Sequence, residues 1–262
     1  MGIKVDGKQY IPRTGELNID IIESAGRKIG LIKATSPKKP PVAIELAKRP
    51  PLLCPGCPHT GFFYVLAGMG QRLKLPGAKE KTVKESNLII TGDIGCYTLG
   101  VYPPLNAMDT NGCMGSSIGT AIGMEKAGLS AKIVAVIGDS TFLHSGITPL
   151  VDAVYNLSKI TVVILDNSTT AMTGHQEHPG TGRSLDHAAT GKIVYEDLGK
   201  ALGIEDVRVF TLGKDCAEFQ QMLKESLASE KLVLIIARRP CVLAAKSIRE
   251  YEKCEQCAAT QP

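Results

Sequence analysis

Two apolar runs rich in β-branched residues flank an amphipathic segment between residues 133 and 167. The first run ends in Gly138-Asp139-Ser140, and the second ends in Asp166-Asn167. This pattern predicts a strand, a helix and a second strand, which is the crossover unit of a parallel sheet. Asp139 and Asn167 then lie at the carboxyl ends of two strands. Ligands of open α/β sheets collect at that edge, so both side chains are candidates for one site.

The rest of the pattern also alternates between helix and strand. It predicts a helix over 59–73, a strand over 88–91 and a helix of small residues over 111–128. Farther along it predicts a helix over 195–202, a strand over 207–211, a helix over 216–229 and a strand over 232–237. Such alternation indicates an α/β fold with a parallel sheet. The polar, glycine-rich stretch 168–191, with three histidines, is long enough to be a functional loop.

The ends of the chain differ from this central part. Residues 1–50 contain short apolar patches followed by a stretch rich in proline and lysine, which we interpret as an N-terminal arm or linker. We place the main domain at residues 51–245. Residues 246–262 form a C-terminal tail.

Composition narrows the possible partners. The chain has 262 residues and a net charge of +4, and its basic residues are scattered rather than clustered. This distribution argues against nucleic acid as a partner. A membrane-spanning helix needs roughly 18 or more apolar residues in a row, and the sequence has no such run. With no apolar signal core at the N-terminus, we expect a soluble, cytoplasmic protein without membrane association.

Cysteine is the most informative residue type in the composition. Eight cysteines in a cytosolic chain indicate metal or redox chemistry more often than disulfides. The two Cys-x-x-Cys pairs lie near opposite ends of the chain, whereas the pairs of a zinc ribbon are usually about 15–20 residues apart. The two pairs therefore do not form one local zinc site. They are Cys54 with Cys57, and Cys254 with Cys257.

Asp139 and Asn167 suit a hard cation. Mg²⁺ prefers oxygen ligands in near-octahedral geometry, and it commonly combines one or two protein side chains with phosphate oxygens. The alternative is structural: Asp139 could only cap the helix after its strand, and Asn167 could only turn the chain. His59 and His144 are candidate catalytic residues, because both could lie near this site.

The spacing of Gly138-Asp139-Ser140 and Asp166-Asn167 resembles the signature of thiamine diphosphate enzymes, written GDG and NN. Two departures are visible, Ser140 for glycine and Asp166 for asparagine. The resemblance implies a parallel-sheet, three-layer thiamine diphosphate-binding fold of the diphosphate-binding type. It also implies Mg²⁺ ligands and cofactor contacts. The implied Mg²⁺ ligands are Asp139, Asn167 and the carbonyl of Thr169, and the implied cofactor contacts add Gly95, Met114, Gly138, Ser140 and Met172.

The cysteines extend the resemblance. Cys54-Pro-Gly-Cys57-Pro-His59, Gly92-Asp93-Ile94-Gly95-Cys96 and Pro240-Cys241, taken with the diphosphate signature, resemble the thiamine half of the 2-oxoacid:ferredoxin oxidoreductases. The match is closest to the alpha subunits of indolepyruvate ferredoxin oxidoreductases and runs from about residue 49 to the C-terminus. It implies a 4Fe-4S cluster held by Cys54, Cys57, Cys96 and Cys241.

Two alternatives to the cluster stay open: the same four cysteines could bind zinc, or they could bind no metal. Cys254 and Cys257 resemble the entrance to a two-cluster ferredoxin domain, but no further cysteine follows them. We therefore interpret the C-terminal tail as a truncated ferredoxin-like start.

The resemblance implies oxidative decarboxylation of a 2-oxoacid, with indolepyruvate or another arylpyruvate as the expected substrate. Coenzyme A would accept the acyl group, and electrons would pass through the cluster to ferredoxin. A separate pyrimidine-binding domain or gamma-type subunit would supply the activating glutamate, so we expect a hetero-oligomer. Two alternatives stay open: a non-redox thiamine diphosphate lyase or synthase subunit, and a non-catalytic iron–sulfur module.

Overall fold

The structure is a computed structural model that describes residues 7–33, 50–70, 87–213 and 216–245. The chain divides into two compact units, residues 1–49 and residues 50–262. The second Cys-x-x-Cys pair, Cys254 and Cys257, lies outside the described residues. The ferredoxin-like interpretation of the tail therefore stays a prediction, as do the domain boundaries at 51 and 245.

The first unit contains a helix that the sequence reading did not anticipate, α1 (Ile19–Lys28). Its N-terminus is capped by Asn18, whose side-chain oxygen accepts a hydrogen bond from the backbone N–H of Ile21 at 3.1 Å. Asp20 in the first turn and basic residues in the last turn match the helix dipole. Local capping thus specifies this helix inside a segment that we interpreted as an arm or linker.

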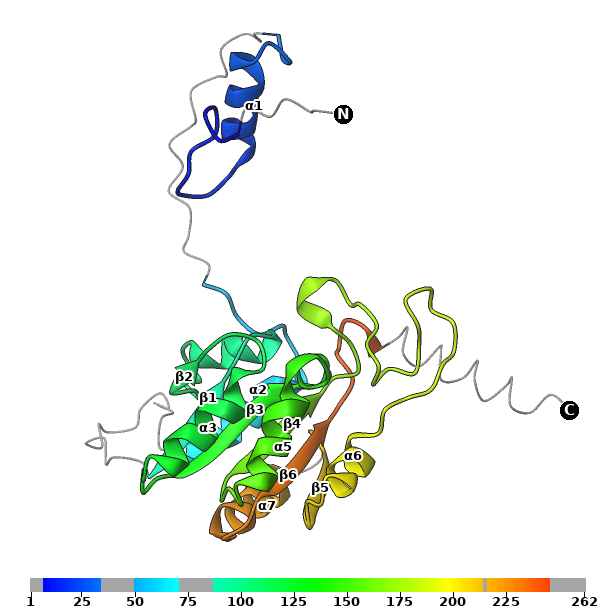
Figure 1. The fold of residues 1–262 in the computed structure, drawn as a ribbon. Coiled ribbons are helices and arrows are strands. Elements are labelled where there is room, and N and C mark those ends of the chain that lie inside the picture. The colour runs from blue at the N-terminus through cyan, green and yellow to red at the C-terminus, as the bar shows by residue number, and fades with distance from the viewer. Residues whose placement is uncertain (1–6, 34–49, 71–86, 214–215, 246–262) are drawn as a thin grey trace, which may run out of the picture. The chain divides into compact units, whose positions relative to one another are not determined.

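The second unit is built on a six-stranded sheet whose strands all run parallel (Figure 1). Their order across the sheet is β2-β1-β3-β4-β6-β5. The parallel α/β fold predicted from the sequence is therefore confirmed. The strands are β1 (Leu88–Gly92), β2 (Thr110–Asn111), β3 (Lys132–Gly138), β4 (Thr161–Asp166), β5 (Asp206–Thr211) and β6 (Val233–Arg238).

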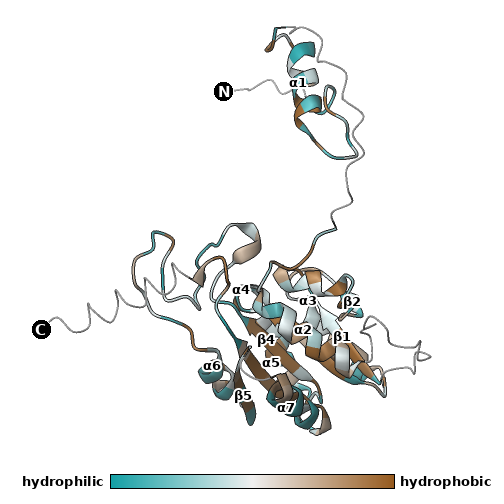
Figure 2. Ribbon diagram, turned by 180° about the vertical axis from the view of Figure 1, so that it is seen from behind, coloured by the Kyte–Doolittle hydropathy of each residue, from teal (hydrophilic) through white to brown (hydrophobic). Residues whose placement is uncertain are grey.

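Helices cover both faces of this sheet and make a three-layer arrangement (Figure 1). On one face lie α2 (Pro58–Met69) and α7 (Cys216–Ala228); on the other lie α3 (Ser116–Lys126), α5 (Ile147–Tyr155) and α6 (Tyr195–Ala201). Strands β3, β4 and β6 are apolar on both faces, because side chains alternate between the two helix layers. The hydrophobic colouring of the central strands in Figure 2 reflects this double burial.

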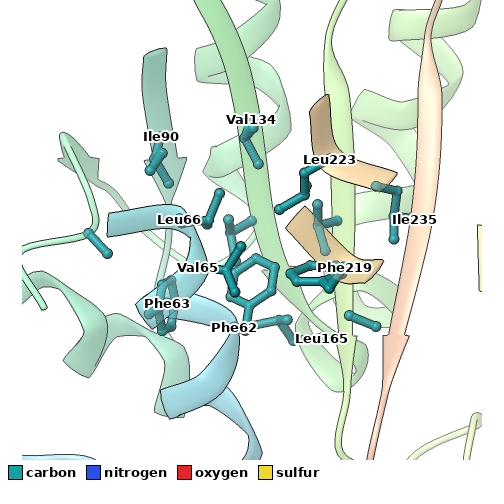
Figure 3. Packing of buried hydrophobic residues seen from close by; sticks show 14 of the residues in the cluster. Phe62, Phe63, Val65, Leu66, Ile90, Val134, Leu165, Phe219, Leu223 and Ile235 are labelled. Atoms are coloured by element: carbon teal, nitrogen blue, oxygen red, sulfur yellow. The ribbon is translucent and has the colours of Figure 1, made fainter. Parts of the chain in front are cut away.

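The core beneath α2 and α7 is dominated by aromatic side chains (Figure 3). Phe62 contacts Phe63 edge to face with ring centroids 5.0 Å apart, and it lies 5.5 Å from Phe219. These rings pack against residues of β3 and β4 such as Val134 and Leu165. Packing of this kind fixes the start of α2, and with it the residues that precede the helix.

The segment after β3 is less regular than the single helix that the pattern predicts. It consists of α4 (Asp139–Thr141), a π-helical turn η2 (Phe142–Gly146) and then α5. Within η2, the Ser145 hydroxyl donates to the carbonyl of Met114 at 3.2 Å. Single π-turns inside helices frequently mark functional sites. Here the turn ties the crossover helix to the segment that precedes α3.

Two further short helices lie in the connections, η1 (Cys96–Val101) and η3 (Ala171–Thr173). The small-residue helix begins later than predicted, at Ser116, because Gly115 takes a left-handed conformation with φ of 83°. No helix in the part of the chain that the structure describes is long and apolar enough to cross a membrane.

Candidate active site at the carboxyl edge of the sheet

A cleft of about 490 Å³, partly open to solvent, lies where β1, β3 and β4 end. This is the edge at which open parallel sheets bind ligands. Nine residues proposed from the sequence for cofactor contact or catalysis line it, together with one proposed cluster ligand. They are His59, Gly95, Met114, Gly138, Asp139, Ser140, Asn167, Thr169 and Met172, with Cys96.

Asp139 lies at the floor of this cleft, directly after β3. Its side chain is 4% exposed, and its two oxygens accept hydrogen bonds from three backbone N–H groups. The N–H of Ser140 donates to Oδ1 at 2.8 Å, and those of Asn167 and Ser168 donate to Oδ2 at 3.1 and 2.8 Å. Burial raises the pKa of Asp139 against the opposing influence of these bonds and of His178.

Asn167 follows β4 and forms a tight turn. Its Oδ1 accepts a hydrogen bond from the N–H of Thr169 at 3.1 Å, and Ser168 between them has a positive φ of 61°. Asparagine favours such turns because its side chain bonds the backbone two residues on. The turn presents Asn167 and Thr169, both buried, to the same cleft as Asp139.

His178, one of the three histidines of the 168–191 stretch, contacts this site although it was not among the predicted site residues. It is buried, and its Nδ1 accepts a hydrogen bond from the N–H of Gly180 at 3.1 Å. That bond leaves the proton on Nε2, which lies 3.4 Å from Asp139 Oδ2. The one sequence signal was a histidine within a long glycine-rich loop, and the spacing did not show that this loop folds back onto β3.

The two histidines proposed as catalytic occupy different surroundings. His59, in the first turn of α2, is buried and lines the cleft, with Nε2 3.5 Å from Asn167 Nδ2. Burial lowers its pKa to about 4, so its imidazole is neutral near pH 7. His144 is exposed, bonds the adjacent Ser145 through Nδ1 at 2.9 Å, and is not part of the cleft lining. The structure therefore brings His59, but not His144, to the site.

Tyr97, which the sequence reading missed, shapes the wall of the cleft. Its ring lies against Gly95 and Gly138, and a Cβ on Gly138 would come within 2.6 Å of the ring. Both glycines are thus required for close approach of the backbone to this ring. The Tyr97 hydroxyl donates to the buried Asp93.

Asp93 holds Met114 in place through the neighbouring backbone. Its Oδ2 accepts hydrogen bonds from the N–H groups of Gly115 at 3.1 Å and Ser117 at 3.2 Å. Burial raises the pKa of Asp93, opposed by the bonds from Tyr97 and from these two N–H groups. Met114 itself is 44% exposed at the mouth of the cleft, so the carboxylate fixes the backbone of a residue whose side chain stays accessible.

The four proposed cluster ligands belong to three segments of the chain near the same edge. Cys54 and Cys57 close a turn through a backbone bond of 3.0 Å, and Cys57 is the N-terminal flanking residue of α2. The N–H of Cys241 donates to the carbonyl of Asn167 at 2.9 Å, while Cys96 begins η1 on the cleft wall.

The thiols are close enough to influence one another. Burial, followed by the charges of Cys57, Cys241 and Cys54, raises the pKa of Cys96 to about 11. Burial also raises the pKa of Cys57, although the backbone N–H groups of His59 and Thr60 oppose the rise. In the described residues, no group of three or more histidine, cysteine or acidic side chains is arranged so that it could hold a metal ion.

The donor atoms of this edge fall into two chemical groups. Asp139, Asn167 and the carbonyl of Thr169 offer hard oxygens, which suit Mg²⁺ and a diphosphate. His59 Nδ1 is buried without a hydrogen-bond partner, so the site has polar capacity left for a ligand. The cysteines offer soft thiolates suited to iron–sulfur clusters or zinc. The chemistry of the residues present therefore fits a diphosphate cofactor with its cation. The thiols match a soft metal in their chemistry, but in the described residues they are not gathered into a metal site.

Comparison with known families identifies the class. Residues 93–237 match the family described as thiamine pyrophosphate enzyme, C-terminal TPP binding domain. The chain belongs to this family of thiamine diphosphate-binding domains. The matched range contains the strands from β2 onward, except the last residue of β6, and it includes both Asp139 and Asn167.

More specific relatives are also found. The chain is 39% identical over 260 residues to the indolepyruvate oxidoreductase subunit IorA of Methanothermobacter marburgensis, covering 97% of this chain and 40% of that protein. It is 38% identical over 264 residues to the subunit of the same name from Archaeoglobus fulgidus, covering 96% and 40%. The chain thus spans about 40% of the length of these curated relatives.

A solved structure shares the fold. The 2-oxoglutarate:ferredoxin oxidoreductase from Magnetococcus marinus, solved with 2-oxoglutarate, coenzyme A and succinyl-CoA bound, aligns with a TM-score of 0.59. The alignment covers 74% of this chain and 66% of that chain, at 16% identity. At this level of identity the likeness concerns the arrangement of strands and helices alone.

Proposed function

We propose that this chain is the thiamine diphosphate-binding part of a 2-oxoacid:ferredoxin oxidoreductase, with indolepyruvate or another arylpyruvate as substrate. The observation that carries the proposal is that an oxygen anchor and three segments carrying four cysteines meet at one edge of the sheet. A non-redox thiamine enzyme would need only the anchor. The relatives named as indolepyruvate oxidoreductase subunits support the same conclusion.

In this proposal the protein binds and orients while the cofactor supplies the chemistry. Thiamine diphosphate, when bound, makes the bond between the keto carbon and the carboxylate of a 2-oxoacid cleavable. Asp139, Asn167 and the carbonyl of Thr169 would hold the Mg²⁺ that binds the diphosphate. His59, kept neutral by burial, would offer a hydrogen-bonding nitrogen to the ligand without adding charge. Gly95, Gly138 and Ser140 would let the diphosphate approach the backbone.

The cysteines would bind a 4Fe-4S cluster close to this cofactor. Cys54, Cys57, Cys96 and Cys241 provide the four thiolates that such a cluster needs. Because Cys96 also lines the cofactor cleft, the distance between the two centres would be short. Electrons from oxidation of the substrate would then leave through the cluster to ferredoxin, and coenzyme A would take the acyl group.

The partner would contribute the rest of the active site. Met114, Met172 and Ile94 line the cleft and are more than 40% exposed, which leaves an apolar rim around its mouth. We propose that a pyrimidine-binding domain, or a gamma-type subunit that carries one, covers this rim and supplies the activating glutamate. Relatives that are named as subunits support a multi-subunit enzyme.

The test is anaerobic co-expression of the chain with candidate partners, followed by three measurements on the purified complex. We expect Mg²⁺-dependent thiamine diphosphate binding by calorimetry, iron and acid-labile sulfide in the ratio of a 4Fe-4S cluster, and dye reduction that requires an arylpyruvate and coenzyme A. Cofactor binding without iron, accompanied by decarboxylation that needs no electron acceptor, would instead identify a non-redox enzyme. Absence of Mg²⁺-dependent cofactor binding in the complex would overturn the proposal.

A further inference from the structure

Asp166 departs from the thiamine diphosphate signature, which has asparagine at this position, and the structure shows a separate use for its charge. It is the last residue of β4, and its side chain is 4% exposed. Oδ1 accepts hydrogen bonds from the N–H of Ser168 at 3.1 Å and from its hydroxyl at 3.2 Å. Oδ2 pairs with Arg238 Nε at 2.6 Å. An asparagine could form the Ser168 turn, but only a carboxylate forms the ion pair.

Arg238 connects this carboxylate to a second one. It is the last residue of β6, directly paired with Asp166 in the parallel ladder. Its Nη1 and Nη2 donate to Glu196 Oε1 and Oε2 at 2.9 and 3.2 Å. Such two-point contacts fix the orientation of a guanidinium as well as its position. We call these three residues the Asp166–Arg238–Glu196 triad.

Backbone bonds on either side of the triad lead to both ligand sets. The N–H of Arg239 donates to the carbonyl of Asp166, and the N–H of Cys241 donates to the carbonyl of Asn167, each at 2.9 Å. These two bonds join the segment after β4 to the segment after β6. The first segment carries the proposed Mg²⁺ ligand Asn167, and the second carries the proposed cluster ligand Cys241. Asp166 and Arg238 are the last residues of β4 and β6, which are neighbours in the sheet (Figure 1).

The electrostatics of the triad favour orientation over bulk stability. Burial lowers the pKa of Arg238, but the bonds from Glu196 and Asp166 outweigh it and raise the pKa overall. Arg238 remains 36% exposed, and partly exposed ion pairs contribute little to the free energy of unfolding. Asp166 is buried, however, and removing the partner of a buried charge carries a large energetic cost.

We propose that the Asp166–Arg238–Glu196 triad is a positioning device that couples the oxygen anchor to the cysteine loop, so that loosening the triad alters ligand binding at both. The inference rests on the proposed function and deepens it. None of the three side chains is a proposed ligand, so each acts through Asn167 or Cys241. Glu196 is the only one of the three that lies on neither of the two joined segments, and it is linked to them through Arg238. It is therefore the best position to perturb.

The experiment compares Glu196→Gln with the unmodified chain in the anaerobic complex. Glutamine keeps the size of the side chain but removes its negative charge and one of the two oxygens that accept from Arg238. Loss of an outer contact of this kind typically weakens metal binding about 10-fold, and we expect that change in the Mg²⁺-dependent affinity for thiamine diphosphate. We also expect a shifted electron paramagnetic resonance spectrum of the reduced cluster. Arg238→Lys, which keeps the charge but loses the fork, should change both readouts in the same direction.

Glu205→Gln is the matched control, because Glu205 forms an exposed pair with Lys231 at 2.5 Å far from any proposed ligand in sequence. It should leave both readouts unchanged. A lower melting temperature in Glu196→Gln and Arg238→Lys with unchanged cofactor affinity and unchanged spectrum would show a merely structural role and overturn the inference. An unmodified complex that binds neither cofactor nor cluster would overturn the proposed function, and this inference with it.

Discussion

The oxygen anchor and the cysteine set lie at the same edge of the sheet but are built in different ways. Asp139 and Asn167 belong to one crossover unit, and backbone N–H groups hold the carboxylate in place before any ligand arrives. The cysteines come from separate segments, and Cys54 is exposed while Cys57, Cys96 and Cys241 are half-buried. Burial and mutual repulsion raise the pKa of Cys96 and of Cys57, so these thiols favour the protonated form.

The oxygen anchor is therefore preorganised by the fold, whereas we expect the cysteine set to reach its final geometry only when it binds a metal. A fold that fixes Asp139 through its own backbone loses little conformational entropy on binding a cation. Raised thiol pKa values oppose the thiolates that a metal requires, and binding must release those protons. We therefore expect the anchor to be present in the chain alone, and the cysteine set to be ordered only when its metal is present.

The largest effect is expected from breaking the cysteine set. Cys57→Ser removes a proposed cluster ligand at the start of α2, and three remaining thiolates cannot satisfy a 4Fe-4S cluster. Iron and sulfide after anaerobic reconstitution should fall to background. Cys216→Ser, an exposed cysteine on α7, should keep the full content. Equal iron in the two variants would remove Cys57 from the ligand set, and zinc in place of iron would redefine the centre.

Asp139→Asn tests the preorganised anchor. The substitution places an amide N–H₂ among backbone N–H donors, and hydrogen bonds to a charged group contribute about 1.5–3 kcal/mol each. We expect the Mg²⁺-dependent affinity for thiamine diphosphate to fall at least about 100-fold, since each tenfold change corresponds to about 1.4 kcal/mol. Asp152→Asn, on the exposed side of α5, is the control for charge loss in the same unit. Calorimetry that shows unchanged binding by Asp139→Asn would eliminate this anchor.

His178→Gln tests whether the glycine-rich loop supports the anchor from outside. Loss of the imidazole next to Asp139 should weaken Mg²⁺ binding roughly 10- to 100-fold, as is typical for residues that orient a metal ligand. Cofactor affinity at saturating Mg²⁺ should change much less. His187→Gln, on the same loop but exposed, should titrate with Mg²⁺ like the unmodified chain. A comparable loss in both variants would indicate a general effect of the loop.

The smallest effect is expected at Ser140, the other departure from the signature. The Thr170 hydroxyl donates to the Ser140 hydroxyl at 2.7 Å, which joins the segments that follow β3 and β4. Ser140→Ala should lower the free energy of unfolding by about 1 kcal/mol, the usual net contribution of one hydrogen bond. Urea denaturation measures this change, with the exposed Ser130→Ala as the reference. A loss no larger than that of Ser130→Ala would show that this bond contributes nothing to the anchor.

The sequence predicted the fold, and the position of Asp139 and Asn167 at the ends of two strands, for a simple reason. The strands are apolar on both faces and short, and the crossover that links Asp139 to Asn167 is local, so periodicity alone orders these elements. The structure confirms the parallel sheet and places nine proposed residues around one cleft. The helix α1 was not predicted because its run of apolar residues is short and interrupted by polar residues. Most of these apolar side chains are also exposed in the structure.

Long-range packing decided what the sequence could not. No spacing rule shows that the loop carrying His178 folds back onto Asp139, or that Tyr97 fills the space against Gly95 and Gly138. Nor does spacing show that His144 is exposed and absent from the lining of the cleft. These contacts depend on the order of strands across the sheet and on one π-turn after β3.

The sequence by itself determined which ligand atoms the chain can offer. Residue identity gives the hard oxygens and the thiols, and the apolar runs that precede them show which residues follow strands. Only the tertiary structure decided that they share one edge. Asp166 illustrates the division: as a residue it was a departure from a signature, and beside Arg238 and Glu196 it becomes part of an ion-pair network. Its role follows from β4 and β6 being neighbours in the sheet, although many residues separate them along the chain.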